Sequence, residues 1–320
     1  MKRRLTALIT AAATVLSSAA ITAEAYSVKI GSSTLSYETT DDYEELLTDG
    51  ITGVAVITGM SDPPDDLVIP AYAETGKDSL VFAAVEEKAF MGLTNITSVS
   101  FPDTITSIGD SAFAGCLALE SVTLPDSISS MGVKVFVSCS QLKYADLGGE
   151  HSRLRAIPEN CFSSCTNLAE VKIPEGVIGI GREAFYGCTS LRSVTVPSTV
   201  QFIGDNAIGL RTNRIDNSIE PVPGFIIFGK KDSAAERYAS GKGIDFIDTE
   251  ATPSGDVNMD GFVDSADASM VLSEYAELAT GGQTTLSAAQ RYLADVDGNG
   301  DTDSADASEI LIIYAENATA

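Results

Sequence analysis

One stretch decides the fold: Ile108-Gly109-Asp110-Ser111-Ala112-Phe113-Ala114-Gly115-Cys116, followed after two residues by Leu119-Glu120-Ser121-Val122-Thr123-Leu124-Pro125. The phenylalanine of this stretch recurs with spacings of 23, 23, 26 and 23 residues, at Phe90, Phe113, Phe136, Phe162 and Phe185. A constant period of this length is typical of a solenoid, in which each unit buries its apolar residues against its neighbours.

Each unit is expected to contribute one short strand. Leu119, Val122 and Leu124 are expected to face inward on such a strand, and Pro125 ends it. Equivalent strands are expected to begin at Ile96, Leu142, Leu168 and Leu191. Stacked in register, these strands predict a parallel sheet along one face of the array.

The cysteines follow the same period. Cys116, Cys139, Cys165 and Cys188 are separated by 23, 26 and 23 residues, whereas Cys161 lies in a neighbouring position. Residues at one repeat position stack on one another as small buried groups. We therefore expect five free thiols rather than disulfides.

The recurring Ala-Phe-x-Gly-Cys pattern resembles the leucine-rich repeats of the BspA-like type, found in bacterial surface proteins. The resemblance covers residues 67–247 and implies a solenoid domain at 67–248 that ends in a cap. That cap would consist of two strands and a helix, at Phe225–Phe228, Ile244–Ile247 and Ser233–Ser240. Residues 26–66 would form an N-terminal cap hairpin region, with Ile51–Ile57 as its clearest strand.

The sheet face of the array is small, polar and of mixed charge. Its expected columns are Thr97, Glu120, Lys143, Ala169 and Arg192; Ser98, Ser121, Tyr144, Glu170 and Ser193; and Ser100, Thr123, Asp146, Lys172 and Thr195. The face carries one aromatic residue and the chain has no tryptophan, so a carbohydrate platform is weakly supported. A surface that binds another protein and a passive solvated face both stay open.

The C-terminal part contains a duplicated segment. After a polar linker at residues 249–254, Asp256–Glu277 aligns with Asp295–Glu316 at an offset of 39 residues. Each copy spaces its acidic and amide side chains as a calcium loop does, with a central glycine and backbone carbonyl ligands from Phe262 and Asp301. The expected ligands are Asp256, Asn258, Asp260, Phe262, Asp264 and Asp267 in the first loop, and Asp295, Asp297, Asn299, Asp301, Asp303 and Asp306 in the second.

Two departures from an ordinary EF-hand are informative. Asp267 and Asp306 stand where an EF-hand has glutamate, and a linker that contains Pro253 precedes the first loop in place of a helix. In these features residues 255–320 resemble dockerins, the modules that bind cohesin domains of cellulosomal scaffolds. The resemblance implies a small all-α domain with two Ca²⁺ ions and a cohesin partner. It also implies partner contacts at Ser265, Ala266, Leu272, Ser273, Ser304, Ala305, Leu311 and Ile312.

Many clostridial dockerins have a Ser/Thr pair followed by basic residues at these positions. This chain has Ser-Ala followed mainly by apolar residues, which predicts a cohesin of another specificity class and recognition by apolar burial. The two halves should offer nearly the same surface, but Ser273-Glu274 in one corresponds to Ile312-Ile313 in the other. For Leu272 and Leu311, a role in the helix core is an equal alternative.

The N-terminus predicts export. Lys2, Arg3 and Arg4 precede the apolar stretch 5–21, and Ala23-Glu24-Ala25 is a cleavage motif, so residues 1–25 are expected to be a signal peptide. The formal net charge of −25 argues against nucleic acid or an anionic membrane as a partner. No later segment is long and apolar enough to span a bilayer.

These features predict a mixed α/β protein: a leucine-rich repeat solenoid with a parallel sheet, followed by an all-α dockerin with two calcium loops. We expect it to be secreted and non-catalytic, with a protein-binding or structural surface anchored to a scaffold for polysaccharide degradation. A carbohydrate-binding accessory module and a glycoside hydrolase within the array are the alternatives. The only histidine, His151, falls in a three-residue insertion at 149–151 of the repeat pattern. A catalytic triad that needs a histidine would therefore depend on this single residue.

Overall fold

The computed structural model describes residues 25–40, 51–74, 79–250 and 252–319. The expected signal peptide lies, but for its last residue, outside the described residues. The chain divides into two units, the first made of residues 1–191 and 199–220 and the second of 192–198 and 221–320. In the part that the structure describes, no helix has the length and apolar character needed to cross a membrane.

The first unit begins with an antiparallel arrangement. β1 (Ala25–Ile30) pairs with β2 (Ser33–Thr40), which pairs with β3 (Gly53–Ser61). β3 then pairs in parallel with β6 (Ser79–Val85), whose other neighbours include β5 (Tyr72–Glu74). The sequence predicts a strand at Ile51–Ile57 in the cap region 26–66. The structure places this strand slightly later, as β3 at Gly53–Ser61.

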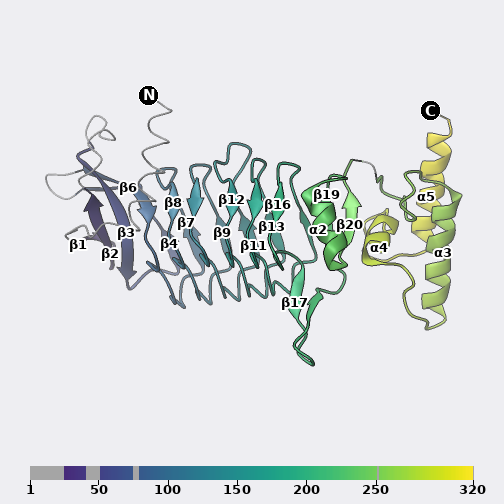
Figure 1. Ribbon diagram of the computed structural model, residues 1–320, viewed down its shortest axis with the longest axis horizontal. Helices are drawn as coiled ribbons and strands as arrows, with labels where there is room; N and C mark the ends of the chain where they lie inside the picture. The colour runs from purple at the N-terminus through teal and green to yellow at the C-terminus, as the bar shows by residue number, and fades with distance from the viewer. Residues whose placement is uncertain (1–24, 41–50, 75–78, 251, 320) are drawn as a thin grey trace. The chain divides into compact units, whose positions relative to one another are not determined.

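The predicted parallel sheet is confirmed. It has the order β13-β11-β9-β7-β4, and Figure 1 shows its strands stacked one beside the next in the first unit. The strands are β4 (Asp66–Val68), β7 (Ser98–Ser100), β9 (Ser121–Thr123), β11 (Tyr144–Asp146) and β13 (Glu170–Lys172). Ser98 is paired with Ser121, Ser121 with Tyr144 and Tyr144 with Glu170, as the expected columns require. The expected fifth strand, from Leu191, is not part of this sheet, because Ser193 pairs with Ile226 in another sheet.

A second set of parallel strands was missed by the sequence analysis. They have two residues each: β8 (Ser107–Ile108), β10 (Ser130–Met131), β12 (Ala156–Ile157), β14 (Gly179–Ile180) and β16 (Phe202–Ile203). β8 joins β6 to β10, and β14 joins β12 to β16. Two residues are too few to produce a readable alternation of apolar and polar side chains.

The core of the array is a stack of rings and thiols. Successive rings from Phe90 to Phe185 lie parallel, with centroids 5.0–5.5 Å apart. All five cysteines are buried and free, as predicted. The four in the column do more than fill space, because each thiol donates to the carbonyl of the phenylalanine in an earlier unit, as Cys116 does to Phe90 at 3.2 Å.

Gly109 and Gly132, which directly follow the two-residue strands β8 and β10, are required by the close stacking of adjacent units. A Cβ at Gly109 would lie 2.5 Å from the backbone nitrogen of Glu87, and one at Gly132 would lie 2.4 Å from that of Asp110. Any larger residue would push adjacent units apart. The same close approach occurs at Gly181 and Gly204, whereas Pro158 takes the equivalent position in one unit.

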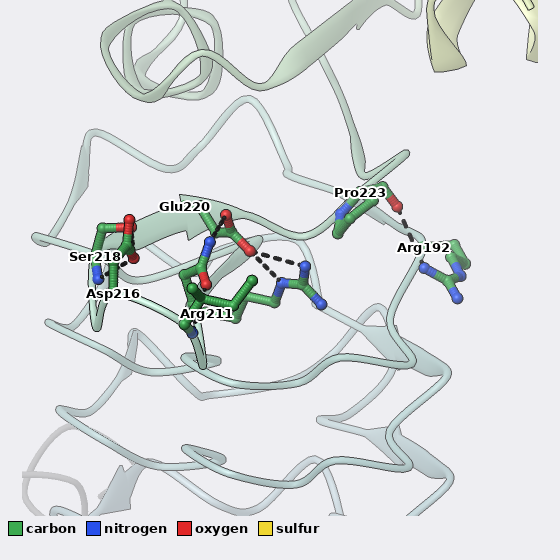
Figure 2. A network of polar contacts seen from close by, with 8 residues as sticks. Arg192, Arg211, Asp216, Ser218, Glu220 and Pro223 are labelled. Carbon is green, nitrogen blue, oxygen red and sulfur yellow. Dashed lines mark hydrogen bonds and ion pairs between the residues drawn. The ribbon is translucent and has the colours of Figure 1, made fainter. Parts of the chain in front are cut away.

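The first unit also carries a hairpin that the sequence analysis did not predict. β17 (Leu210–Thr212) pairs with β18 (Ile219–Pro221). Figure 2 shows Arg211 bound to Glu220, whose Oε1 accepts from Nε at 3.0 Å and from Nη2 at 2.8 Å. Asp216 accepts two hydrogen bonds from Ser218, which lower the pKa of its carboxyl.

In the second unit, β15 (Ser193–Thr195), β19 (Ile226–Gly229) and β20 (Asp245–Asp248) form a parallel sheet. α2 (Ala234–Lys242) is capped by Ser233 and ends at Gly243, which has φ of 66°. This strand–helix–strand order is the one predicted for the C-terminal cap. We call residues 226–248 the terminal cap.

Three further helices follow in the second unit: α3 (Ser265–Ala279), α4 (Ala288–Ala294) and α5 (Ser304–Asn317). Figure 1 labels all three near the C-terminus. Their shared apolar core consists of Val257, Val263, Ala268, Val271, Leu286, Ala294, Ala307 and Ile310. Each calcium-type loop leads directly into one of the two long helices.

Candidate calcium loops and docking helices

The first loop folds its acidic side chains inward. Asp256 is fully buried, and its two oxygens accept from the backbone N–H groups of Asp260 at 3.1 Å and Gly261 at 2.9 Å. Asn258 Oδ1 also accepts from the Asp260 N–H, at 2.8 Å. Gly261 has φ of 93°, a conformation that a side chain would strain. The glycine therefore permits the turn that brings these oxygens together.

Asp267 closes the first loop. It is fully buried, and it accepts from the N–H of Asn258 at 3.0 Å and of Asp264 at 2.9 Å. Asp264 in turn caps α3 by accepting from the Ala266 N–H at 2.6 Å. Asp264 therefore has a structural role in addition to the calcium contact that the sequence suggests.

The second loop repeats this arrangement. Asp306 is fully buried and accepts from the N–H groups of Val296 at 3.0 Å, Asp297 at 3.3 Å and Asp303 at 2.9 Å. Asp303 caps α5 as Asp264 caps α3. One carboxylate oxygen from each of Asp295, Asp297 and Asp306 lies within 4.8 Å of the others.

A divalent cation fits this second loop. Asp295 Oδ1 is buried and has no hydrogen-bond partner, while its Oδ2 accepts from the Gly300 N–H at 3.1 Å. An unpaired buried carboxylate oxygen beside two further carboxylates is unfavourable unless a cation balances it. Ca²⁺ prefers such a set of hard oxygen ligands. In the first loop, burial raises the pKa of Asp256, and the charges of Asp267 and Asp260 raise it further.

All eight side chains expected to contact a partner are exposed. The exposed fractions of Leu272 and Leu311 are 46% and 44%, so the alternative that they form the helix core does not hold. Their neighbours Val271 and Ile310 are the fully buried residues instead. The two halves thus present closely similar apolar positions to solvent.

The expected difference between the two helices needs correction. The alignment of Glu274 with Ile313 suggests that both face a partner. Glu274 is fully buried, however, so a partner cannot contact it. Ile313 packs partly buried against the helical core, whereas Ile312 is 52% exposed. The second half therefore offers one additional isoleucine, not two. A sequence offset identifies equivalent positions but not which side of each helix they occupy.

Glu274 anchors the connection between α3 and α4. Its carboxylate accepts from the hydroxyl of Thr284 and from the N–H and hydroxyl of Thr285, the latter two at 2.8 and 2.7 Å. Burial alone would raise the pKa of Glu274, but these hydrogen bonds outweigh it and lower the pKa. No sequence motif marks this residue, because the second copy has isoleucine in its place.

Replacing Glu274 by alanine should destabilise the three-helix part by about 2 kcal/mol, since it leaves the buried partners of the carboxylate unsatisfied. Calorimetric unfolding with calcium present is the measurement. Glu277→Ala, a nearby exposed change, is the control and should cost less than about 0.5 kcal/mol. Equal melting of the two variants would contradict the anchoring role. Because the pKa is lowered, this stabilisation is present above the unfolded pKa and lost as pH falls.

Two exposed tyrosines were not included among the expected contacts. Tyr275 and Tyr314 are each 44% exposed and lie three residues after Leu272 and Leu311. Residues three apart share a helix face. The Tyr-Ala-Glu triplet that ends both copies was the available signal, and the equal exposure of the two tyrosines extends the exposed apolar surface of both helices.

The sheet face of the repeat array is tied together by its own charges. Glu120 pairs with Lys143 at 3.0 Å, and Asp146 with Lys172 at 3.6 Å, each across neighbouring strands. Tyr144 also donates to Asp146 at 3.3 Å. Exposed pairs of this kind add little stability, but they neutralise the face. The geometry identifies no ligand for it.

Family models match both parts of the chain. Residues 83–213 match the BspA type leucine rich repeat region in six copies, and residues 254–312 match the dockerin type I domain. The chain combines a BspA-type leucine-rich repeat region with a C-terminal type I dockerin. Dockerins of this type bind calcium and have cohesins as partners. No curated protein sequence matches the chain.

Several solved leucine-rich repeat structures are similar to the chain. A leucine rich cell surface protein from Faecalibacterium prausnitzii is 20% identical, with a TM-score of 0.41, over 66% of this chain and 72% of that one. A leucine rich repeat protein of T. pallidum is 24% identical, with a TM-score of 0.31, over 48% and 86%. A leucine-rich repeat protein from Bacteroides ovatus is 14% identical, with a TM-score of 0.24, over 64% and 71%.

Proposed function

We propose that this chain is a secreted, non-catalytic repeat protein that a calcium-loaded dockerin attaches to a cohesin-bearing extracellular scaffold. The observation that carries the proposal is the duplicated loop–helix unit. Each copy has a fully buried closing aspartate, Asp267 or Asp306, and an exposed leucine at the matching helix position. In this proposal residues 1–25 are the signal peptide, 249–254 the linker and 255–320 the dockerin.

Two calcium ions would be held by the twelve ligands that the sequence suggests. The buried, unpaired Asp295 Oδ1 supports this assignment for the second loop, and the matching hydrogen bonds of Asp256 and Asp267 support it for the first. The loops would hold the starts of α3 and α5 so that Ser265, Ser304 and the exposed apolar residues face a cohesin.

The repeat array would act as a protein-binding or structural surface within a polysaccharide-degrading complex. The neutral face, with Tyr144 as its one aromatic residue, favours this role over a glycan platform. A pull-down of the calcium-loaded chain against a panel of cohesins and plant polysaccharides tests the proposal. Retention by a cohesin only when calcium is present supports it, and retention by polysaccharide alone contradicts it.

The docking mode can be tested by introducing a charge. Ser265 and Ser304 are exposed at the starts of α3 and α5, so a cohesin that reads only this surface can accept either half. Each single change, Ser265→Asp or Ser304→Asp, should then reduce cohesin affinity only about twofold, because one of two equivalent orientations is lost. The double variant should lose affinity by 100-fold or more, on the order of 3 kcal/mol.

Titration calorimetry against the cohesin selected by the pull-down is the measurement. An Asn317→Asp variant, which adds the same charge at the exposed far end of α5, is the control. Complete loss from Ser304→Asp alone would exclude dual docking and make α5 the sole contact. Ile312 would then be the reason for that preference, since burying one isoleucine contributes about 1.5–3 kcal/mol.

A further inference from the structure

The middle helix of the dockerin has two apolar sides. On one side, Ala294 belongs to the core that α3 and α5 share. On the other, Ala289 and Leu293 are buried against Ile226 and Ile247 of the terminal cap. A helix of seven residues that is buried on two sides has little stability of its own. Its stability therefore depends on both neighbours.

Polar and aromatic contacts reinforce the side that meets the terminal cap. The Ala289 N–H donates to Asp245 Oδ2 at 3.1 Å, so a carboxylate of β20 satisfies one of the free N–H groups at the start of α4. Tyr292 lies edge-on to Phe228 of β19, with ring centroids 4.9 Å apart. The contact between α4 and the terminal cap therefore includes a hydrogen bond and a ring pair of defined geometry in addition to apolar packing.

The same helix leads into the second calcium loop. Asp295 is the C-cap residue of α4 and also the first ligand expected in that loop. Its Oδ1 is the buried carboxylate oxygen without a partner. The end of α4 is thus held in the loop, while its side is held on the terminal cap.

We propose that α4 couples the second calcium loop to the terminal cap, so that cation binding at Asp295 stabilises residues 226–248. The inference rests on the proposed calcium function and goes beyond it, because a dockerin acting as an independent plug would leave the cap unaffected. A ligand that binds only the folded form stabilises everything that folds with it. The cap would share in that stabilisation through Ala289, Tyr292 and Leu293.

Hydrogen exchange of the full chain, read by mass spectrometry with excess calcium and then with chelator, tests the coupling. Chelation should speed exchange in both the dockerin and residues 226–248, the latter by roughly tenfold or more. Peptides from residues 98–146 serve as the internal reference and should not change. Faster exchange in the dockerin with an unchanged cap would overturn the coupling and leave the calcium function intact. No change in either would overturn both.

A variant separates coupling from general loss of stability. Ala289→Glu places a charge in the apolar contact and beside Asp245, so the dockerin should still respond to calcium while the cap no longer does. Gln283→Glu adds the same charge at an exposed position before α4 and should behave as the unmodified chain does. Tyr292→Ala, a milder change, should reduce the response of the cap. A cap response that persists in both interface variants would contradict the proposal.

Discussion

Removing calcium is expected to unfold residues 255–320 while the stacked repeats stay folded. This segment contains thirteen acidic residues and one basic residue, Arg291. Asp256, Asp267 and Asp306 are fully buried, so without a cation their charges repel in a poorly solvated environment. Calcium at 100 times its dissociation constant adds about 2.7 kcal/mol per site. A module with so few core residues has little stability of its own. The binding free energy at the two calcium sites therefore decides whether it folds.

Scanning calorimetry of the full chain in calcium and in EDTA is the measurement. The transition assigned to the dockerin should move down by tens of degrees or vanish in EDTA, and the transition of the repeats should not. An EDTA scan that matches the calcium scan would contradict the prediction.

Asp306→Ala should remove one of the two proposed calcium sites. The replaced carboxylate accepts three backbone N–H groups, and one of its oxygens belongs to the carboxylate cluster. Titration with calcium should therefore give a stoichiometry of one, with affinity lost at least 100-fold at the second site. Glu309→Ala removes an equal charge from an exposed position of α5 and should keep two sites. Two unchanged sites in Asp306→Ala would disprove the assignment.

The repeat period explains why so much of the array was predictable. The position of each phenylalanine fixes one coil against the next, so the register of Ser121 with Tyr144 follows from counting. The two-residue strands from β8 (Ser107–Ile108) to β16 (Phe202–Ile203) also recur with the repeat period, but each is too short to show an alternation of apolar and polar side chains. The hairpin of β17 and β18 occurs once, so no period indicates it.

At the dockerin, spacing predicted a set of ligand oxygens but not what surrounds them. The alternation from Asp256 to Asp267 identifies a loop, because ligands must point to one centre. Glu274 was misjudged because its burial comes from Thr284 and Thr285, which belong to a loop outside the duplication. The contact of Ala289 with Asp245 joins residues 44 positions apart and has no sequence signature.

Alkaline pH is expected to unfold the repeat array steeply. Burial raises the pKa of Cys116 to about 11 and the pKa of both Cys139 and Cys188 to about 12. Burial also raises the pKa of Cys161 and Cys165. Each thiol stays protonated inside the stack because its thiolate would lose hydration there and gain no cation.

The direction of the effect follows from proton binding. Below the unfolded pKa of about 9, the thiols are protonated in both states and pH has no influence through them. Above it, the unfolded chain releases protons that the folded chain retains, so stability falls as pH rises toward the folded pKa values. The slope is about 1.4 kcal/mol per thiol and pH unit. By pH 11, Cys116, Cys139 and Cys188 together oppose folding by roughly 8 kcal/mol, which is comparable to the whole stability of a domain.

Urea unfolding under reducing conditions at pH 8, 9, 10 and 10.5 measures this slope. A variant with Cys116, Cys139 and Cys188 replaced by alanine is the matched control: it is less stable at pH 8, because cavities replace the thiols, but its stability should fall less steeply. Equal slopes would assign the alkaline unfolding to other groups. Alkylation of the unreduced chain at pH 8 gives the complementary result. The folded protein should take up almost no label and the denatured protein five, because all five thiols are free and buried.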